Sequence, residues 1–369
     1  ETFEHCLELR ESTNKFFFDQ VSKKPIISVL RDFSAPVLVS MQRKSNELAL
    51  LARHDTDEFN RWDAVQQLAT NVALKLIRCH QKKQSLKLDE DFLETIAETL
   101  ARISDDCSLQ AATLSLPAET ELGQKMDVID VDAIHAVRQF MRRSIADVFE
   151  SELMTVMGSC TATTAYKFDA WSCGQRRLKN VCLSYLMELQ TDEIVSQCYN
   201  QFLNADNMTD TLTSFQILSN HDCPQRLQAI DNFYERFSIY SLTLDKWFSV
   251  QATSRLPNTG EVVCDLVRHQ DFTLKNPNKV RALIGAFCFG NQVRFHCATG
   301  SGYKLLADTV LDLDPVNPQI AARLLSSMSL WHKFDEQRKS VMRHHLSRIA
   351  NTQDLSSDTY EIAKKSLEH

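Results

Sequence analysis

Histidine and cysteine side chains have the most evident capacity for chemistry in this chain, and their spacing decides which chemistry is open to them. The chain contains 11 of each. A catalytic zinc site gathers imidazoles, thiolates or carboxylates, often with two histidines four residues apart on one helix. No His-Glu-x-x-His segment occurs in the 369 residues. The sequence therefore predicts that this chain binds no metal ion of its own.

Histidines and cysteines that are neighbours in the sequence do not supply such a site. His344 and His345 are adjacent, so on a helix their side chains point about 100° apart. Cys79 and His80 have the same geometry. The cysteines show no repeated spacing and no Cys-x-x-Cys pair, which is typical of reduced, buried cysteines in a cytoplasmic protein.

Nucleophilic and phosphate-binding motifs are also absent from the sequence. There is no Gly-x-Ser-x-Gly segment for a serine nucleophile, and no Walker loop or dinucleotide fingerprint. Two of the eight glycines fall in Thr299-Gly-Ser-Gly302, so we expect a loop there with Ser301 as an ordinary loop residue. We predict no catalytic residue in this chain.

The composition favours long helices over a many-stranded sheet. Glycine and proline each occur only 8 times, and few chain breakers mean few tight turns. The formal net charge of −7 disfavours a nucleic-acid partner. No apolar run approaches the roughly 20 residues that a membrane span requires. We therefore expect a protein that binds neither nucleic acid nor a membrane.

The first 40 residues have a different pattern from the rest. Cys6–Arg10 alternates apolar and polar residues, and Pro25–Leu30 is rich in β-branched residues, so we predict strands in 1–40. Two or three strands cannot bury both faces of a sheet by themselves. We therefore interpret 1–40 as the remnant of an upstream β-sandwich domain. We expect 41–366 to form one helical domain. Residues 367–369 (Leu-Glu-His) resemble the start of a vector-encoded tag, and Glu1 is not a start methionine, so we expect an excised fragment.

Apolar residues beyond about residue 55 recur at helical spacing. Trp62, Val65, Leu68, Val72 and Leu76 are three or four residues apart and predict one buried stripe. Further helices are predicted at 131–154, 175–189, 191–203, 208–218, 222–237, 259–269, 277–288, 318–329, 332–350 and 357–366. No strict sequence period occurs. The predicted fold is mainly α: an irregular superhelix of antiparallel helix pairs, similar to a HEAT or armadillo bowl, with a short N-terminal β remnant.

Two helix starts carry polar residues that could contact a ligand. In Asn276–Arg281, Pro277 sets the helix start, and the cations Lys279 and Arg281 oppose the helix dipole unless they are paired. Gln319 and Arg323 follow Asn317-Pro318, are four residues apart and share one helix face. By themselves the two arginines are more typical of ordinary solvated or ion-paired helix faces than of a ligand site.

Short segments in a fixed order are similar to the C-terminal part of bacterial alanyl aminopeptidases, the aminopeptidase N type of zinc peptidase. They are Phe33–Val37, Arg53–His54, Phe59–Ala64, Asn207–Asp210, Asp245–Phe248, Gln251–Ser254, Asn276–Asn278, Leu283–Phe287, Gly300–Tyr303, Asn317–Gln319 and Ala322–Leu324. The resemblance implies a helical bowl that follows a β-sandwich domain and a zinc-binding catalytic domain. The sequence departs from its relatives at Cys288–Gly290 and at Gln292–Arg294.

The resemblance implies a role for the bowl and for three of its residues. By this resemblance, the helical bowl closes over the active site of the upstream catalytic domain. Three of its residues would then face the downstream side of a peptide substrate: Arg281, Gln319 and Arg323. Zinc belongs to the parent enzyme, and we expect the fragment alone to be inactive. The alternative is a free-standing α-solenoid that binds a protein partner and catalyses nothing.

Overall fold

The fold is described from a computed structural model that covers residues 4–19, 21–102, 106–161 and 165–368. The first half of the helical part contains α1 (Ser45–His54), α2 (Glu58–Gln81), α3 (Glu90–Ala101), α4 (Cys107–Leu114), α5 (Glu119–Gln124), α6 (Val131–Val148), α7 (Glu150–Ser159), α8 (Ala170–Leu186), α9 (Asp192–Asn204) and α10 (Met208–Leu218). The second half contains α11 (Pro224–Phe237), α12 (Ser241–Ala252), α13 (Thr259–Leu266), α14 (Pro277–Val280), α15 (Ala286–Gly290), α16 (Gln292–Phe295), α17 (Ser301–Leu313), α18 (Pro318–Leu325), α19 (Glu336–Ala350) and α20 (Ser357–Leu367).

Short tighter or wider turns connect several of these helices. The 3₁₀ turns are η1 (Arg31–Phe33), η2 (Met187–Leu189), η4 (Ser326–Met328) and η5 (Trp331–Lys333). The segment η3 (Arg281–Gly285) is a π-helical turn inserted between α14 and α15. Within the described ranges there is no β-strand, and a single parallel bridge joins Ile129 to Phe334.

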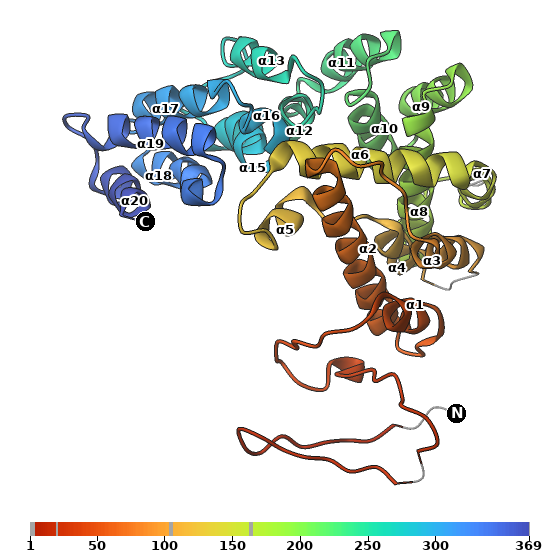
Figure 1. The fold of residues 1–369 in the computed structure, drawn as a ribbon. Helices are drawn as coiled ribbons and strands as arrows, with labels where there is room; N and C mark the ends of the chain where they lie inside the picture. Colours follow the sequence, from red (N-terminus) through yellow and green to blue (C-terminus); the bar gives the residue numbers. More distant parts are fainter. Residues whose placement is uncertain (1–3, 20, 103–105, 162–164, 369) are drawn as a thin grey trace.

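Neighbouring helices pack in pairs, and the pairs follow one another along an arc (Figure 1). The pairs α1 with α2, α9 with α10, and α19 with α20 pack closely along the chain. The helix α6 crosses the middle of the arc and packs against α2, α5, α8 and α16. It therefore ties early helices to late ones. The predicted mainly α superhelix is confirmed.

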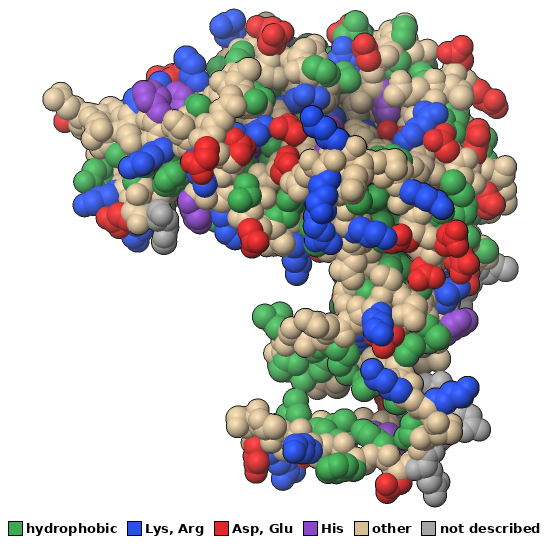
Figure 2. Space-filling view, in the orientation of Figure 1, with side chains coloured by type: hydrophobic (Ala, Val, Ile, Leu, Met, Phe, Trp, Pro, Cys, Tyr) green, Lys and Arg blue, Asp and Glu red, His purple; other side chains and the backbone are tan. Residues whose placement is uncertain are grey.

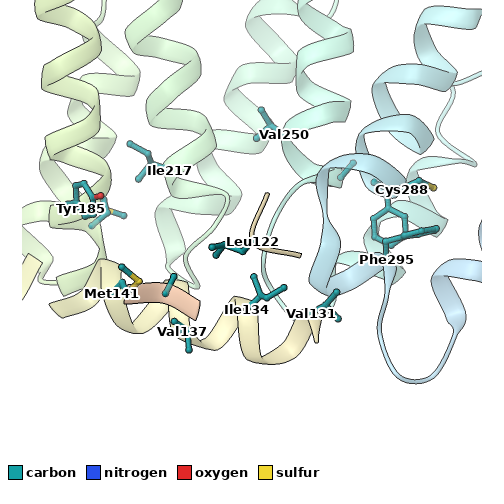
Figure 3. Close-up of a cluster of buried hydrophobic side chains, with 14 of the residues drawn as sticks. Leu122, Val131, Ile134, Val137, Met141, Tyr185, Ile217, Val250, Cys288 and Phe295 are labelled. Carbon is teal, nitrogen blue, oxygen red and sulfur yellow. The ribbon is translucent and has the colours of Figure 1, made fainter. Parts of the chain in front are cut away.

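A continuous apolar core runs through the superhelix (Figure 3). Val131, Ile134, Val137 and Met141 lie along one side of α6 and are almost completely buried. Their three- and four-residue spacing gives one apolar stripe, which explains why this helix is covered on that side. Each such side chain contributes about 1.5–3 kcal/mol when it is removed from water.

The N-terminal segment (residues 1–44) contains no β-strand in its described residues. Its backbone is extended, and η1 is its only helical turn there. Apolar side chains such as Phe17 and Ile27 are exposed along it (Figure 2). A strand needs a neighbour to pair its backbone groups, and the described residues provide none.

The N-terminal segment is attached to the start of α2 by polar contacts. The guanidinium of Arg31 lies 2.6 Å from Oδ1 of Asp55. The amide of Asn60 donates to the hydroxyl of Ser28 and to the carbonyl of Val29. The carboxylate of Asp57 accepts from the Asn60 backbone and caps α2. The acidic run before α2 thus caps a helix and holds the extended segment.

Several predicted helix boundaries differ from the structure. The single helix predicted over 131–154 is broken at Phe149, whose φ of −118° and ψ of 28° lie outside the helical range. The helix predicted at 332–350 begins at Glu336, after the 3₁₀ turn η5. Of the cysteines predicted to be buried, Cys182 is fully buried, whereas Cys79 and Cys264 are only partly buried. Burial raises the pKa of the Cys182 thiol to about 12.

Candidate functional site

Arg281, Gln319 and Arg323 all have exposed side chains. Arg281 is the first residue of the π-helical turn η3, and Gln319 and Arg323 lie one turn apart on α18. The two elements approach each other at Gly285. A Cβ at Gly285 would lie 3.8 Å from Cδ2 of Leu324, the residue after Arg323. The predicted residues therefore come from two neighbouring elements.

Asparagine caps fix where both of these elements begin. The side chain of Asn276 accepts from the backbone N–H of Asn278, and Pro277 is the first residue of α14. The side chain of Asn317 accepts from the backbone N–H of Ile320 at 3.2 Å, and Pro318 is the first residue of α18. Proline at this position loses no intrahelical hydrogen bond. Asn317 and Pro318 therefore fix the start of α18.

The two arginines keep most of their hydrogen-bonding capacity. Arg281 Nη1 donates to Oδ1 of Asn278 at 3.3 Å. Among the described residues, neither Arg281 nor Arg323 forms an ion pair. A guanidinium offers several N–H donors in a planar fork that matches a carboxylate. Both side chains can therefore bind an anionic group of a ligand.

Lys279, which lies beside Arg281 in the sequence, has a structural role instead. Its Nζ atom lies 2.7 Å from Oδ1 of Asp245 and 3.3 Å from the carbonyl oxygen of Ser241. The same ammonium lies 5.6 Å from the centre of the Phe248 ring. Lys279 is buried, so its charge is satisfied by α12 and not by a ligand. The dipole conflict noted in the sequence is resolved by this ion pair.

The Asn207–Asp210 segment also serves the fold. Asp210 is buried and accepts from Lys179 at 2.6 Å and from the amide of Asn180 at 2.8 Å. Asn207 caps α10 by accepting from the backbone N–H of Asp210. These bonds join α8 to α10. The Asn207–Asp210 segment, one of those that resemble the aminopeptidases, thus holds α8 and α10 together.

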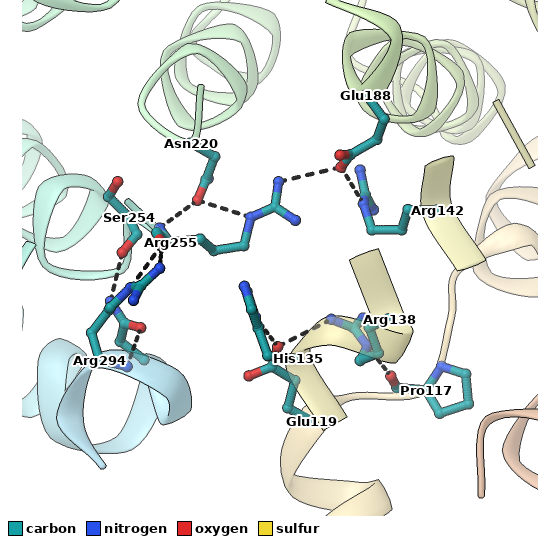
Figure 4. A network of polar contacts seen from close by, with 11 residues as sticks. Pro117, Glu119, His135, Arg138, Arg142, Glu188, Asn220, Ser254, Arg255 and Arg294 are labelled. Carbon is teal, nitrogen blue, oxygen red and sulfur yellow. Dashed lines mark hydrogen bonds and ion pairs between the residues drawn. The ribbon is translucent and has the colours of Figure 1, made fainter. Parts of the chain in front are cut away.

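A polar cavity that the sequence did not reveal lies between α5, α6, α10 and α16 (Figure 4). It has a volume of about 560 Å³. Arg138, Arg142 and Arg255 line it, and we call it the arginine cavity. Arg138 and Arg142 are four residues apart on α6, which is a weak sequence signal, but Arg255 is far away in sequence. Only the fold brings the three together.

Glu188 holds two of these arginines in place. Its Oε1 atom lies 2.6 Å from Nε of Arg142 and 3.3 Å from Nη2 of Arg255. Burial alone raises the pKa of Glu188, but Arg142 and Arg255 outweigh it, so the pKa is lowered. The buried imidazole of His221 lines the same cavity, and burial lowers its pKa to about 4. His221 is therefore uncharged at neutral pH.

Metal-binding residues do not converge in the described part of the chain. No group of three or more histidine, cysteine, aspartate or glutamate side chains there is placed to hold a metal ion. The imidazole of His296 accepts or donates at Tyr303 Oη, 3.0 Å away, and stacks on Phe334. His296 thus packs in the core and is not placed with other donors to hold a metal ion. In the same described ranges, no helix is both long and apolar enough to span a membrane.

The fold is an irregular arc of packed helix pairs. Residues 45–368 match the family described as "Domain of unknown function (DUF3458_C) ARM repeats", and the chain belongs to that family. Residues 1–42 match "Domain of unknown function (DUF3458) Ig-like fold".

Two curated relatives are similar in sequence to nearly the whole chain, and one solved structure is similar to it in fold. Aminopeptidase N of Escherichia coli is 34% identical over 365 residues, which are 98% of this chain and 41% of the relative. Aminopeptidase N of Haemophilus influenzae is 31% identical over 100% of this chain and 42% of the relative. The crystal structure of Legionella pneumophila aminopeptidase A in complex with aspartic acid has a TM-score of 0.85 and 32% identity, covering 95% of this chain and 42% of that one. The chain therefore spans about two fifths of these relatives and is related to the C-terminal part of aminopeptidase N-type enzymes.

Proposed function

We propose that this chain is the C-terminal helical domain of a zinc-dependent aminopeptidase, which removes N-terminal residues from peptides in the cytoplasm. The observation that carries the proposal is the 34% identity to an aminopeptidase N over 98% of the chain. In this proposal a zinc ion would be held by the upstream catalytic domain of the same protein, where it would supply Lewis-acid activation of the scissile carbonyl. The chain described here caps the active-site chamber and binds the downstream part of the peptide.

The geometry of three exposed side chains supports the anchoring role. Arg281 and Arg323 have no carboxylate partner among the described residues, and Gln319 lies one turn before Arg323. Arg281 also lies in a π-helical turn. Such turns are rare, and they occur frequently at functional sites. In the proposal, the two guanidinium groups bind the substrate's terminal carboxylate and the amide of Gln319 bonds its backbone. Buried Lys279 has no part in this contact.

The experiment compares two substrates in the whole enzyme that contains this chain. A tripeptide has a downstream carboxylate, whereas an amino-acid p-nitroanilide has none. A charge-assisted hydrogen bond contributes about 1.5–3 kcal/mol, so Arg323→Ala should lower kcat/KM for the tripeptide roughly 10- to 150-fold. The anilide should be cleaved as before. Arg343→Ala, which removes an exposed arginine on α19, is the matched control and should leave both substrates unaffected.

Two results would contradict the proposal at different levels. If Arg323→Ala lowered kcat/KM equally for both substrates, or for neither, Arg323 would not anchor the downstream carboxylate. A whole protein that releases no N-terminal residues from any peptide would remove the aminopeptidase function and favour the protein-binding solenoid.

A further inference from the structure

We infer that the arginine cavity is a binding site for a small oxyanion, held through carboxylate or phosphate oxygens by Arg138, Arg142 and Arg255. This site is separate from the proposed substrate contacts, because Arg281, Gln319 and Arg323 do not line it. Its success or failure is therefore independent of the aminopeptidase proposal.

Positive charge exceeds negative charge around the cavity. The three arginines face two carboxylates, those of Glu119 and Glu188. The imidazole of His221 adds no charge at neutral pH. Buried charges of one sign are costly unless they are paired. A bound anion would balance the excess.

Arg138 is the least well neutralised of the three. Its Nε atom donates to the carbonyl of Pro117 at 2.7 Å, but its nearest carboxylate oxygen, on Glu119, lies 3.9 Å from Nη1. The imidazole of His135 is much closer to that oxygen, at 2.9 Å. Burial, which the distant carboxylate does not offset, lowers the pKa of Arg138. The guanidinium is thus partly buried and has no carboxylate oxygen closer than 3.9 Å.

The other two arginines also keep donors that the protein does not use. Arg142 donates through Nε to Glu188 and through Nη2 to the carbonyl of Ser184. Arg255 donates through Nε to Oδ1 of Asn220 and through Nη2 to Glu188. A guanidinium has more N–H donors than these bonds occupy. In Figure 4, Arg142 reaches Glu188 from α6 and Arg255 reaches it from the loop between α12 and α13, with Arg138 one turn away on α6.

The scaffold holds these groups before any ligand arrives. The guanidinium of Arg142 lies 5.1 Å from the centre of the buried Tyr185 ring, and the Tyr185 hydroxyl donates to the carbonyl of Leu114. The Asn220 side chain also accepts from the backbone N–H of Arg255 at 2.9 Å. Fixed side chains lose little conformational entropy on binding. The cavity volume of about 560 Å³ is within the range of small-molecule sites.

The test is calorimetric titration of the full 369-residue chain at pH 7 and low ionic strength. Inorganic phosphate and citrate are the two probes, because they separate phosphate from carboxylate recognition. We expect saturable binding of at least one probe, weakened by added sodium chloride as screening requires. Arg138→Gln should weaken that binding about tenfold or more. Arg177→Gln, which removes an exposed arginine on α8, should bind as the parent chain does.

A second variant changes the charge in the opposite direction. Glu119→Gln removes the carboxylate nearest to Arg138, so it should strengthen anion binding severalfold by removing repulsion. This variant keeps all three arginines, so it tests the site even if Arg138→Gln does not fold, which circular dichroism would show. Binding of neither probe, or equal binding by the parent chain and Glu119→Gln, would overturn the inference.

Discussion

Nζ of Lys279 lies 2.7 Å from Oδ1 of Asp245, and this ion pair lies in the interior between α12 and α14. The two side chains are only 7% and 14% exposed. In the sequence, Lys279 and Arg281 are two similar cations near the start of one helix. The structure separates them: one cation is an internal tie between helices, and the other is exposed.

Lys279→Met should therefore destabilise the fold. Removing one partner of a buried pair leaves the other charge without compensation, which costs about 3–5 kcal/mol. The free energy of unfolding, measured by urea titration with circular dichroism, should fall by that amount. Lys275→Met, at an exposed position four residues earlier, is the control and should change it little. A loss as small as that of the control would show that Asp245 is satisfied without Lys279.

Gly302→Ala should also destabilise the protein, since α17 begins with a close backbone approach at this residue. A Cβ at Gly302 would lie 2.2 Å from the carbonyl oxygen of Phe295. The backbone has to move, and we expect a loss of about 1–3 kcal/mol. The measurement is the free energy of unfolding in urea.

Gly260→Ala is the matched control for this steric argument. Nothing lies within 4 Å of a Cβ at Gly260, which is in α13. Alanine should stabilise the protein there by about 0.4–1 kcal/mol, because it restricts the unfolded chain. If both alanine variants shifted stability in the same direction, the close approach at Gly302 would not be the cause.

Stability should fall as the pH is lowered from 7 towards 5. Burial lowers the pKa of His221 to about 4 and that of His296 to about 3. Their ordinary value is near 6.5. Between these values the unfolded chain binds protons that the folded chain excludes, so stability rises with pH. Each histidine should contribute roughly 2 kcal/mol of loss between pH 7 and pH 5.

Protonation of Glu188 should also lower the stability of the fold, but at a lower pH than the histidines do. Its pKa is lowered in the folded state by Arg142 and Arg255 against the effect of burial. Its stabilisation is therefore present above the ordinary glutamate pKa and is lost as the pH falls through the lowered one. Thermal unfolding followed at several pH values would show both effects. His221→Asn should flatten the slope between pH 7 and pH 5, and an unchanged slope would exclude His221 as a contributor.

Removing the two proposed substrate arginines singly and together would test whether they bind the same group of the peptide. Arg281→Ala should weaken tripeptide cleavage by the whole enzyme in the same direction as Arg323→Ala, because both guanidinium groups are unpaired among the described residues. If they bind the same carboxylate, the double variant should lose less than the product of the two single effects. Steady-state kcat/KM values for the four proteins give this coupling. Independent, multiplicative losses would place the two arginines on different parts of the peptide.

Local sequence patterns determined much of the helical fold. The apolar stripe of α2, the cap and proline of α18, and the mainly α class depend on neighbours three or four residues apart. Such interactions are written in a short stretch of chain. The strands expected in the N-terminal segment did not form in its described residues, because a strand depends on a distant partner that a local pattern does not contain.

Long-range contacts were decided only by the tertiary structure. Asp245 and Lys279, or Arg138 and Arg255, are far apart in the sequence, and no spacing rule connects them. The superhelix brings them together because α6 crosses the arc and α12 packs beside η3. The exposure of Arg281 and the burial of Lys279, two residues earlier, follow from which side of one turn faces α12. Residue types and helical periods fix the elements, but the packing of those elements decides which charges are paired inside and which remain available to a ligand.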